Sequence, residues 1–329
     1  MLGGLARRAA YVEKVQGENR HALVVDSGDL FFSFQDYSDS EKALKKAQVI
    51  GRAYRKMRAA AVNVGCLDLL QGVDFLRQEY SQGLPLVSAN LLDPSTKAPI
   101  FPPYIIKEVG GVRVAFFGLL HPNPGPEIGS AIRRANEGKI LIADPIEAAR
   151  ETLRKIRGKA DCIIVLSDLG LYKDQTVAKE VPGINFILGG HEGRFTRKAV
   201  QAGMTYIFQS SHKGMYLGKL QLTLENPSGR FRDAGEIQYL QERIDGLSLY
   251  IRGLEEAGKR QPDKGNPARN RSIHDLTRQR EALQEELKRA KEAGTQGNRF
   301  LFKLEALEKA LPEDEEVRRW ISKAGIDKD

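Results

Sequence analysis

The chain has 329 residues, of which 41% are hydrophobic and 29% charged, and its formal net charge at pH 7 is +8. This apolar content can fill one large core or two smaller ones, and it excludes intrinsic disorder as the main state. No apolar run approaches the roughly 20 residues of a membrane-spanning helix, so no membrane span is expected. The two cysteines, Cys66 and Cys162, form no C-x-x-C pair, which excludes a zinc ribbon and a disulfide framework.

The excess of positive charge lies mostly in the first part of the chain. Residues 242–329 hold 19 Lys and Arg against 18 Asp and Glu, so residues 1–241 carry nearly all of the basic excess. That excess is scattered, without a basic run or a basic stripe interleaved with aromatic residues, and nucleic-acid binding is therefore not expected. A modest basic excess is compatible with a phosphate ester or nucleotide as ligand.

Through residues 1–241, short apolar runs alternate with patterns typical of helices, which indicates a layered α/β fold. Helices are expected at residues 40–60 and 145–156. Strands are expected at residues 21–25, 61–64, 84–89, 104–109, 112–119, 162–166, 184–188, 205–209, 217–224 and 231–240.

Residues 242–329 have a different character, because they are dense in balanced charge and follow helical patterns. A helix over 242–257 is followed by a loop rich in Pro and Gly, and a capping-box pattern at Ser272 opens a second helix that ends at Gly294. The sequence therefore predicts a helical hairpin. An extended segment at 298–307 and a short last helix that carries Trp320 follow it.

These patterns predict two domains, an α/β domain over 1–241 and a charged helical extension over 242–329. Within the extension, Leu276, Leu283 and Leu287 form a narrow apolar stripe. The stripe is first a packing face inside the hairpin. The alternative is a face within 242–294 that docks a protein partner, although the repeat is short for a coiled coil.

Chemically active residues follow several of the expected strands. Asp29 follows the first strand, Cys66 the second, Asp168 the strand at 162–166 and His191 the strand at 184–188. Binding sites in α/β sheets form where parallel strands end, and carboxylate, thiol and imidazole groups are metal ligands. Each residue also has a structural interpretation: a turn for Asp29 and His191, a small buried side chain for Cys66, and a helix cap or turn for Asp168.

Seven segments of the first 241 residues occur in a telling order, namely GGLARRAAYVEKV, LVVDSGDLF, LPLVSANLLD, PYIIKEVGGVRVAFFGLL, DPIEAA with ADCIIVLSDLG, VPGINFILGGH and GMYLGKLQL. Through these segments the region resembles the 5'-nucleotidase branch of the calcineurin-like metallophosphoesterases. The resemblance implies a four-layer α-β-β-α sandwich with a dinuclear metal centre at the strand ends, and a phosphate monoester or nucleotide as ligand.

The resemblance also locates departures from the family's site. Asp29 matches the bridging carboxylate, and His191 matches the first His of the G-H-x-H motif. The other matched positions are substituted: the metal-binding Asn is Cys66, the catalytic His is Leu67, the His after the L-S strand end is Asp168 and the second His of G-H-x-H is Gly193.

From these substitutions we expect at most one metal ion, Mn or Zn, held by Asp29, Cys66, Asp168 and His191. No catalytic residue is assigned, because the leucine at position 67 cannot donate a proton. The activity of this chain is expected to be weak or lost, as in a pseudo-enzyme of nucleotide catabolism. The alternative is a non-catalytic binding or scaffold module that docks a partner through the helical hairpin.

The family's opening D-x-H strand precedes the matched region, and the chain begins at Met1. Two explanations stay open at this point, a start that lies further upstream and a diverged homologue without this strand. The family is mostly exported, so a periplasmic location is expected from the resemblance, and a cytoplasmic one if Met1 is the true start.

Overall fold

A computed structural model describes residues 2–33, 40–196, 198–211, 214–227, 229–260, 266–292 and 296–326. Its helices are α1 (Leu5–Glu18), α2 (Ser40–Lys56), the 3-10 helix η2 (Leu67–Leu69), α3 (Val73–Ser81), α4 (Pro126–Asn136), α5 (Pro145–Ile156), α6 (Leu171–Glu180), α7 (Glu236–Arg260), α8 (Pro267–Glu292) and α9 (Glu315–Lys323). Its strands are β1 (Val24–Asp26), β2 (Ala59–Asn63), β3 (Leu86–Val87), β4 (Leu91–Leu92), β5 (Tyr104–Val109), β6 (Val112–Leu119), β7 (Leu141–Ile142), β8 (Cys162–Ser167), β9 (Phe186–Gly189), β10 (Val200–Ala202), β11 (Thr205–Gln209), β12 (Tyr216–Thr223), β13 (Arg232–Asp233) and β14 (Arg299–Ala306).

Two sheets make up the centre of the fold. The smaller has the order β1-β2-β3, with all of its strands parallel, and β1 stands at its edge. The larger has the order β10-β11-β9-β8-β6-β5, and β11, β9, β8 and β6 run parallel to one another. Strand β2 packs against β6 and β8, so the two sheets lie face to face. Their adjacent parallel strands bring several carboxyl ends to the same region.

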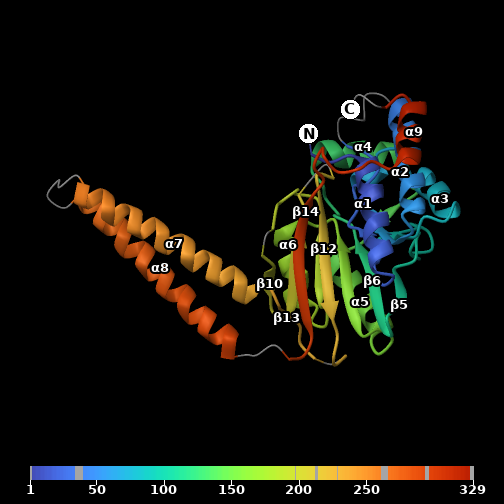
Figure 1. Ribbon diagram of the computed structural model, residues 1–329. Coiled ribbons are helices and arrows are strands. Elements are labelled where there is room, and N and C mark those ends of the chain that lie inside the picture. The colour runs from blue at the N-terminus through green and yellow to red at the C-terminus, as the bar shows by residue number, and fades with distance from the viewer. Residues whose placement is uncertain are drawn as a thin grey trace. The chain divides into compact units, whose positions relative to one another are not determined.

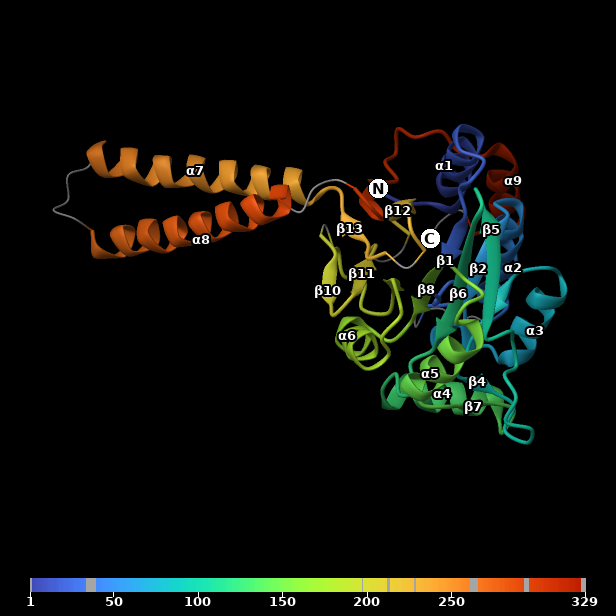
Figure 2. The same cartoon turned by 90° about the horizontal axis from the view of Figure 1, so that it is seen from below.

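Helices cover the outer face of each sheet, as Figure 2 shows. Helix α2 packs on β2, while α5 and α6 pack on the larger sheet. One buried core joins Ala53 of α2 to Val62 of β2, and another joins Leu153 of α5 to Val165 of β8. Small and β-branched side chains on the strands allow this close stacking of helix on sheet. The layers confirm the expected α-β-β-α sandwich.

Most of the expected elements occur where the sequence placed them, but two local predictions are wrong. The segment 231–240 forms only the short strand β13 before α7 begins at Glu236, because the Asp233 side chain accepts from the Gly235 amide and turns the chain. Helix α8 begins at Pro267 and not at Ser272. The Asn266 side chain caps it by accepting from the amides of residues 268 and 269, and Ser272 bonds back into the helix.

The chain divides into two compact units, Met1–Lys219 with Lys303–Asp329, and Leu220–Phe302. These limits differ from the predicted boundary at 241. In the first unit, α9 packs against α1 and α2, and Asp314 caps α9 and pairs with Lys56 (Figure 1). The last helix therefore belongs to the α/β sandwich.

In the second unit, α7 and α8 pack side by side (Figure 1). Leu240, Ile244 and Leu287 form their small core, and Leu283 packs against it. The leucine stripe of α8 therefore faces α7. In the described part of the chain, no helix has the length and apolar character needed to cross a bilayer.

Candidate metal centre

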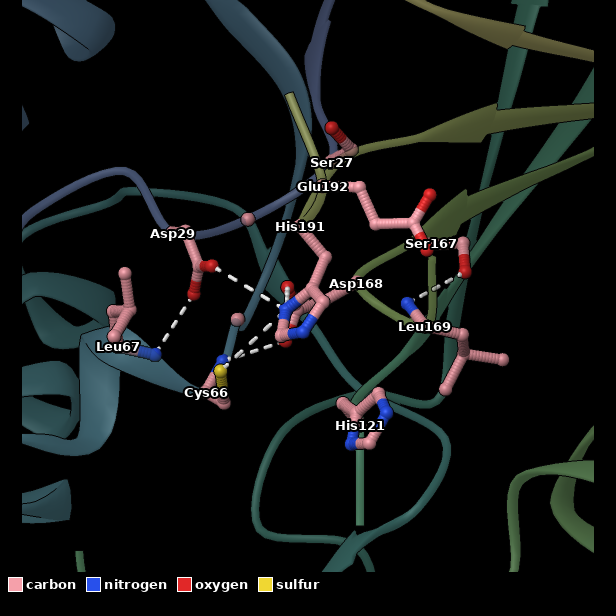
Figure 3. Close-up of polar contacts among 12 residues, drawn as sticks. Ser27, Asp29, Cys66, Leu67, His121, Ser167, Asp168, Leu169, His191 and Glu192 are labelled. Atoms are coloured by element: carbon pink, nitrogen blue, oxygen red, sulfur yellow. Dashed lines mark hydrogen bonds and ion pairs between the residues drawn. The ribbon is translucent and has the colours of Figure 1, made fainter. Parts of the chain in front are cut away.

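Four strand ends bring the predicted ligands together. Asp29 follows β1, Cys66 follows β2, Asp168 directly follows β8 and His191 follows β9. One potential ligand atom from each of these residues lies within 4.8 Å of those of the others. Figure 3 shows the four side chains converging, two from each sheet. We call these four residues the ligand cluster.

Glycines and unusual backbone angles allow this convergence. A Cβ on Gly65 would lie 2.2 Å from the Asp29 amide nitrogen, so only glycine lets the loop after β2 approach the loop after β1. Asp29 and His191 have φ angles of 55° and 65°, in the left-handed region that non-glycine residues rarely adopt. Such backbone conformations concentrate at functional sites.

Hydrogen bonds fix the orientation of the cluster. Nδ1 of His191 lies 3.2 Å from Oδ1 of Asp168 and 3.9 Å from Sγ of Cys66. The Cys66 amide donates to Oδ2 of Asp168 at 2.7 Å, and the Leu67 amide donates to Oδ1 of Asp29 at 2.8 Å. One oxygen of each carboxylate is thus held by the loop after β2.

The ligand cluster contains two carboxyl groups and a thiol, and its imidazole is the one member that can carry a positive charge. Burial raises the pKa of Asp29 well above its ordinary value, and the charges of Asp168 and Asp68 raise it further. Burial, with Asp168 and Asp29, also raises the pKa of the Cys66 thiol. The hydrogen bond to Asp168 raises the pKa of His191. A bound cation would favour the ionised forms of these acids, so the donor set fits a divalent metal ion.

Known proteins are similar to this chain in sequence and in structure. No protein-family profile matches the chain. It is 27% identical over 266 residues to the 2',3'-cyclic-nucleotide 2'-phosphodiesterase/3'-nucleotidase of Salmonella typhimurium, a match that covers 70% of this chain and 40% of the relative. The crystal structure of a 5'-nucleotidase precursor from Thermus thermophilus is 25% identical and superposes with a TM-score of 0.55, covering 68% of this chain and 46% of that one.

These relatives confirm the resemblance to the 5'-nucleotidase branch of the calcineurin-like metallophosphoesterases. The calcineurin-like phosphoesterase YfkN from Bacillus subtilis shares its fold, with a TM-score of 0.64 at 18% identity over 98% of this chain and 88% of that one. The chain spans 40% of the length of the Salmonella relative. It is a 5'-nucleotidase-like metallophosphoesterase homologue, and this family is metal-dependent.

The structure shows what the residues do at three positions where the resemblance implies substitutions. Leu67 bonds Asp29 through its backbone amide, and its side chain has no proton to donate. Cys66 is fully buried, and its thiol faces His191. Gly193 has a φ of 62° and lies in the loop after β9. The chain therefore holds one compact group of potential ligands next to a leucine that cannot act as a proton donor.

Sequence reasoning overlooked several groups around the cluster. The ring of His121 stacks on that of His191 with a centroid separation of 4.9 Å. Its Nε2 lies 2.9 Å from Nζ of Lys173. Because β6 runs parallel to β8, the end of β6 lies beside the other strand ends, and this pairing is the signal that would have placed His121 there.

Two further buried acids flank the cluster. Asp68 accepts from the amides of Phe31 and Gly65, and burial raises its pKa to about 7. Asp174 accepts from the Ser167 hydroxyl, and burial likewise raises its pKa to about 7.

Two other side chains near the strands have structural roles. Asn90 is buried and bonds the backbone of Leu120 and Ala143. Cys162 lies in the core of β8.

Proposed function

We propose that the ligand cluster binds one divalent metal ion, and that the chain binds phosphate monoesters beside it and hydrolyses them only weakly. The observation that carries this proposal is the convergence of Asp29, Cys66, Asp168 and His191 within 4.8 Å. Family membership supports the substrate class, since relatives are named as nucleotidases and nucleotide phosphodiesterases.

The surroundings of the cluster favour a cation. Asp68 and Asp168 are buried together with the Cys66 thiol, and Asp29 is partly buried beside them. Burial, and then repulsion from Asp168, raise the pKa values of Asp29 and Asp68. Buried carboxylates are stable when they are neutralised or when they coordinate a metal. The thiol and imidazole favour Zn or Mn over Mg or Ca. The backbone angles of Asp29 and His191 point both side chains inward at the expense of local strain.

When bound, a divalent metal ion would act as a Lewis acid toward a phosphoryl oxygen. The chain's own residues position that chemistry: the amides of Cys66 and Leu67 hold the two carboxylates, and His191 bonds Asp168. The Leu67 side chain has no proton to give to a leaving oxygen. Absence of a positioned acid typically lowers a rate by about 10²- to 10⁴-fold, which supports weak hydrolysis.

Metal content and turnover test the proposal directly. The purified chain, dialysed against Zn²⁺ or Mn²⁺, is expected to retain about one ion per chain by elemental analysis, and Asp29→Asn is expected to lose it. Asp93→Asn is the matched control, because Asp93 lies on an exposed turn and bonds only local groups. Hydrolysis of AMP and of an aryl phosphate is measured on the same samples.

Absence of bound metal in the wild-type chain would contradict the metal site. Turnover at the rate of an active dinuclear relative, lost in Asp29→Asn, would contradict weak hydrolysis.

A scaffold role through residues 242–294 is the second candidate. Leu283 packs against the core of the helical pair and Leu287 lies within it, so these leucines are engaged with α7. Leu249 and Tyr250 on α7 are 69% and 61% exposed and offer an alternative contact surface. If this hypothesis holds, replacing Leu249 and Tyr250 with Ser is expected to abolish partner binding and to leave the metal content unchanged. A periplasmic location is likewise proposed from the family alone.

A further inference from the structure

The Lys173 ammonium near the ligand cluster has an imidazole, not a carboxylate, as its partner. Lys173 stands in the first turn of α6, and its ammonium contacts Nε2 of His121 at 2.9 Å. Within the described parts of the chain, no carboxylate oxygen pairs with this ammonium, whereas Arg55 and Lys56 each pair with a carboxylate. A half-buried ammonium without an anion is costly unless a ligand supplies one.

The hydrogen bonds of His121 also require a further acceptor, because two donors face the two nitrogens of its ring. The Asn123 amide donates to Nδ1 of His121 at 3.1 Å, and the Lys173 ammonium faces Nε2. A neutral imidazole has one N–H and one acceptor nitrogen, so it cannot accept both bonds. Whichever nitrogen carries the hydrogen, one donor faces another donor. An oxyanion at the pair would accept the remaining hydrogen.

The pair also lies where a substrate of the proposed site would extend. The His121 ring stacks on that of His191, and Figure 3 shows it at the edge of the ligand cluster. Glu192, an acid in the loop after β9, accepts from the Leu171 amide at 3.3 Å and is paired with Arg194 at 2.8 Å.

We propose that Lys173 and His121 form an oxyanion subsite that holds the phosphoryl group of a phosphate ester next to the ligand cluster. The subsite rests on the proposed function for its substrate class. Lys173 supplies the positive charge, and His121 supplies an N–H. Both act as positioning residues for the phosphoryl group. An imidazole after β6 and an ammonium on α6 thus lie near the cluster, while the side chain at position 67 is not a donor.

Phosphate binding tests the subsite without relying on turnover. Inorganic phosphate is titrated by calorimetry into the full chain, once free of metal and once loaded with Mn²⁺. The Lys173→Met variant is expected to weaken the phosphate Kd about tenfold or more, since it removes a charged hydrogen bond. Lys173→Arg is expected to restore binding. Lys179→Met, an exposed lysine on the same helix, is expected to leave the Kd unchanged.

A second variant and a spectroscopic readout guard against misfolding. His121→Phe keeps a ring to stack on His191 and is expected to weaken phosphate binding while the metal content stays that of wild type. In the wild-type chain, phosphate is expected to shift the imidazole carbon–proton resonances of His121. Equal Kd values for wild type and Lys173→Met, or no phosphate binding by wild type, would overturn the subsite. If the wild-type chain binds no metal, the proposed function is overturned instead. The titration of the metal-free chain with phosphate then tests the subsite separately.

Discussion

Asp29 and His191 face each other across the junction of the two sheets, with Oδ2 of one 3.9 Å from Nδ1 of the other, and both hold a positive φ. Asp29 follows a strand of the smaller sheet and His191 a strand of the larger. Each such backbone angle costs on the order of 1 kcal/mol or more, and an ordinary turn avoids it. Two of them at one point indicate that the fold maintains this pair of side chains.

Two buried acids beside the ligand cluster, Asp68 and Asp174, make the stability of the metal-free chain sensitive to pH. Asp68 and Asp174 have folded-state pKa values of about 7, above the ordinary 3.8, so between pH 4 and 7 the folded protein binds more protons than the unfolded chain. The free energy of unfolding is therefore expected to fall as pH rises through this window, by on the order of a few kcal/mol. The raised pKa of His191 acts in the same direction, because its contribution is lost as pH rises.

Urea unfolding of metal-free protein at pH 5 and pH 7.5 measures this effect. Asp174→Asn is expected to flatten the pH dependence, because the uncharged amide no longer titrates. Saturating metal is expected to restore about 2.7 kcal/mol at pH 7.5 when its concentration is 100 times the Kd. A metal-free chain that is more stable at pH 7.5 than at pH 5 would contradict the prediction.

Close approach of the loops after β1 and β2 makes Gly65 sensitive to substitution. Gly65→Ala is expected to destabilise the fold by about 1–3 kcal/mol, because the new methyl group would overlap the amide and carboxylate of Asp29. Since Asp29 must move, metal affinity is also expected to fall at least about tenfold. Chemical denaturation and metal titration measure the two effects.

Gly246 provides the matched control for that substitution. It lies on exposed helix α7, and a Cβ there meets no atom within 4 Å. Gly246→Ala is expected to stabilise the helical pair by about 0.5–1 kcal/mol and to leave metal binding unchanged. Equal effects of the two substitutions on metal affinity would show that Gly65 has no special relation to Asp29.

Much of the sandwich could be predicted because its strands are buried and locally distinct. Residues 104–109, 112–119 and 205–209 form strands at the predicted bounds, and α5 occupies the predicted 145–156. The start of α7 was placed too late, because the polar turn at Asp233 interrupts a run with mixed strand and helix character. The start of α8 was also placed too late, since Ser272 resembles a cap but Asn266 precedes it with the same chemistry.

The candidate site was predictable only for residues that follow the strands identified as parallel. The four residues of the ligand cluster fit that rule, whereas His121 follows a strand that the sequence showed only as half of a hairpin. Lys173 could not be inferred, because α6 brings it to His121 through tertiary packing. Local sequence patterns contain no such information.

Cys66 is expected to determine which metal the cluster prefers. Its buried thiol has a raised pKa, so metal binding must displace a proton, and the apparent affinity should increase with pH. Cys66→Asn removes the soft ligand and is expected to shift the preference from Zn²⁺ toward Mn²⁺. Competition titrations at pH 6.5 and pH 8 measure both trends. An unchanged Zn-to-Mn preference in Cys66→Asn would show that the thiol does not bind the metal.

The resemblance matches Leu67 to the family's catalytic His, so we expect that an imidazole at this position raises activity. Leu67→His leaves the backbone amide that bonds Asp29 in place and adds a proton donor next to the cluster. In the metal-loaded chain, we expect kcat for an aryl phosphate to rise at least about tenfold over wild type, with a new dependence on an ionisation near pH 6.5. Leu67→Asn, which has similar size but no titrating group, is the control, and an equal rise in that variant would assign the gain to polarity and not to proton transfer.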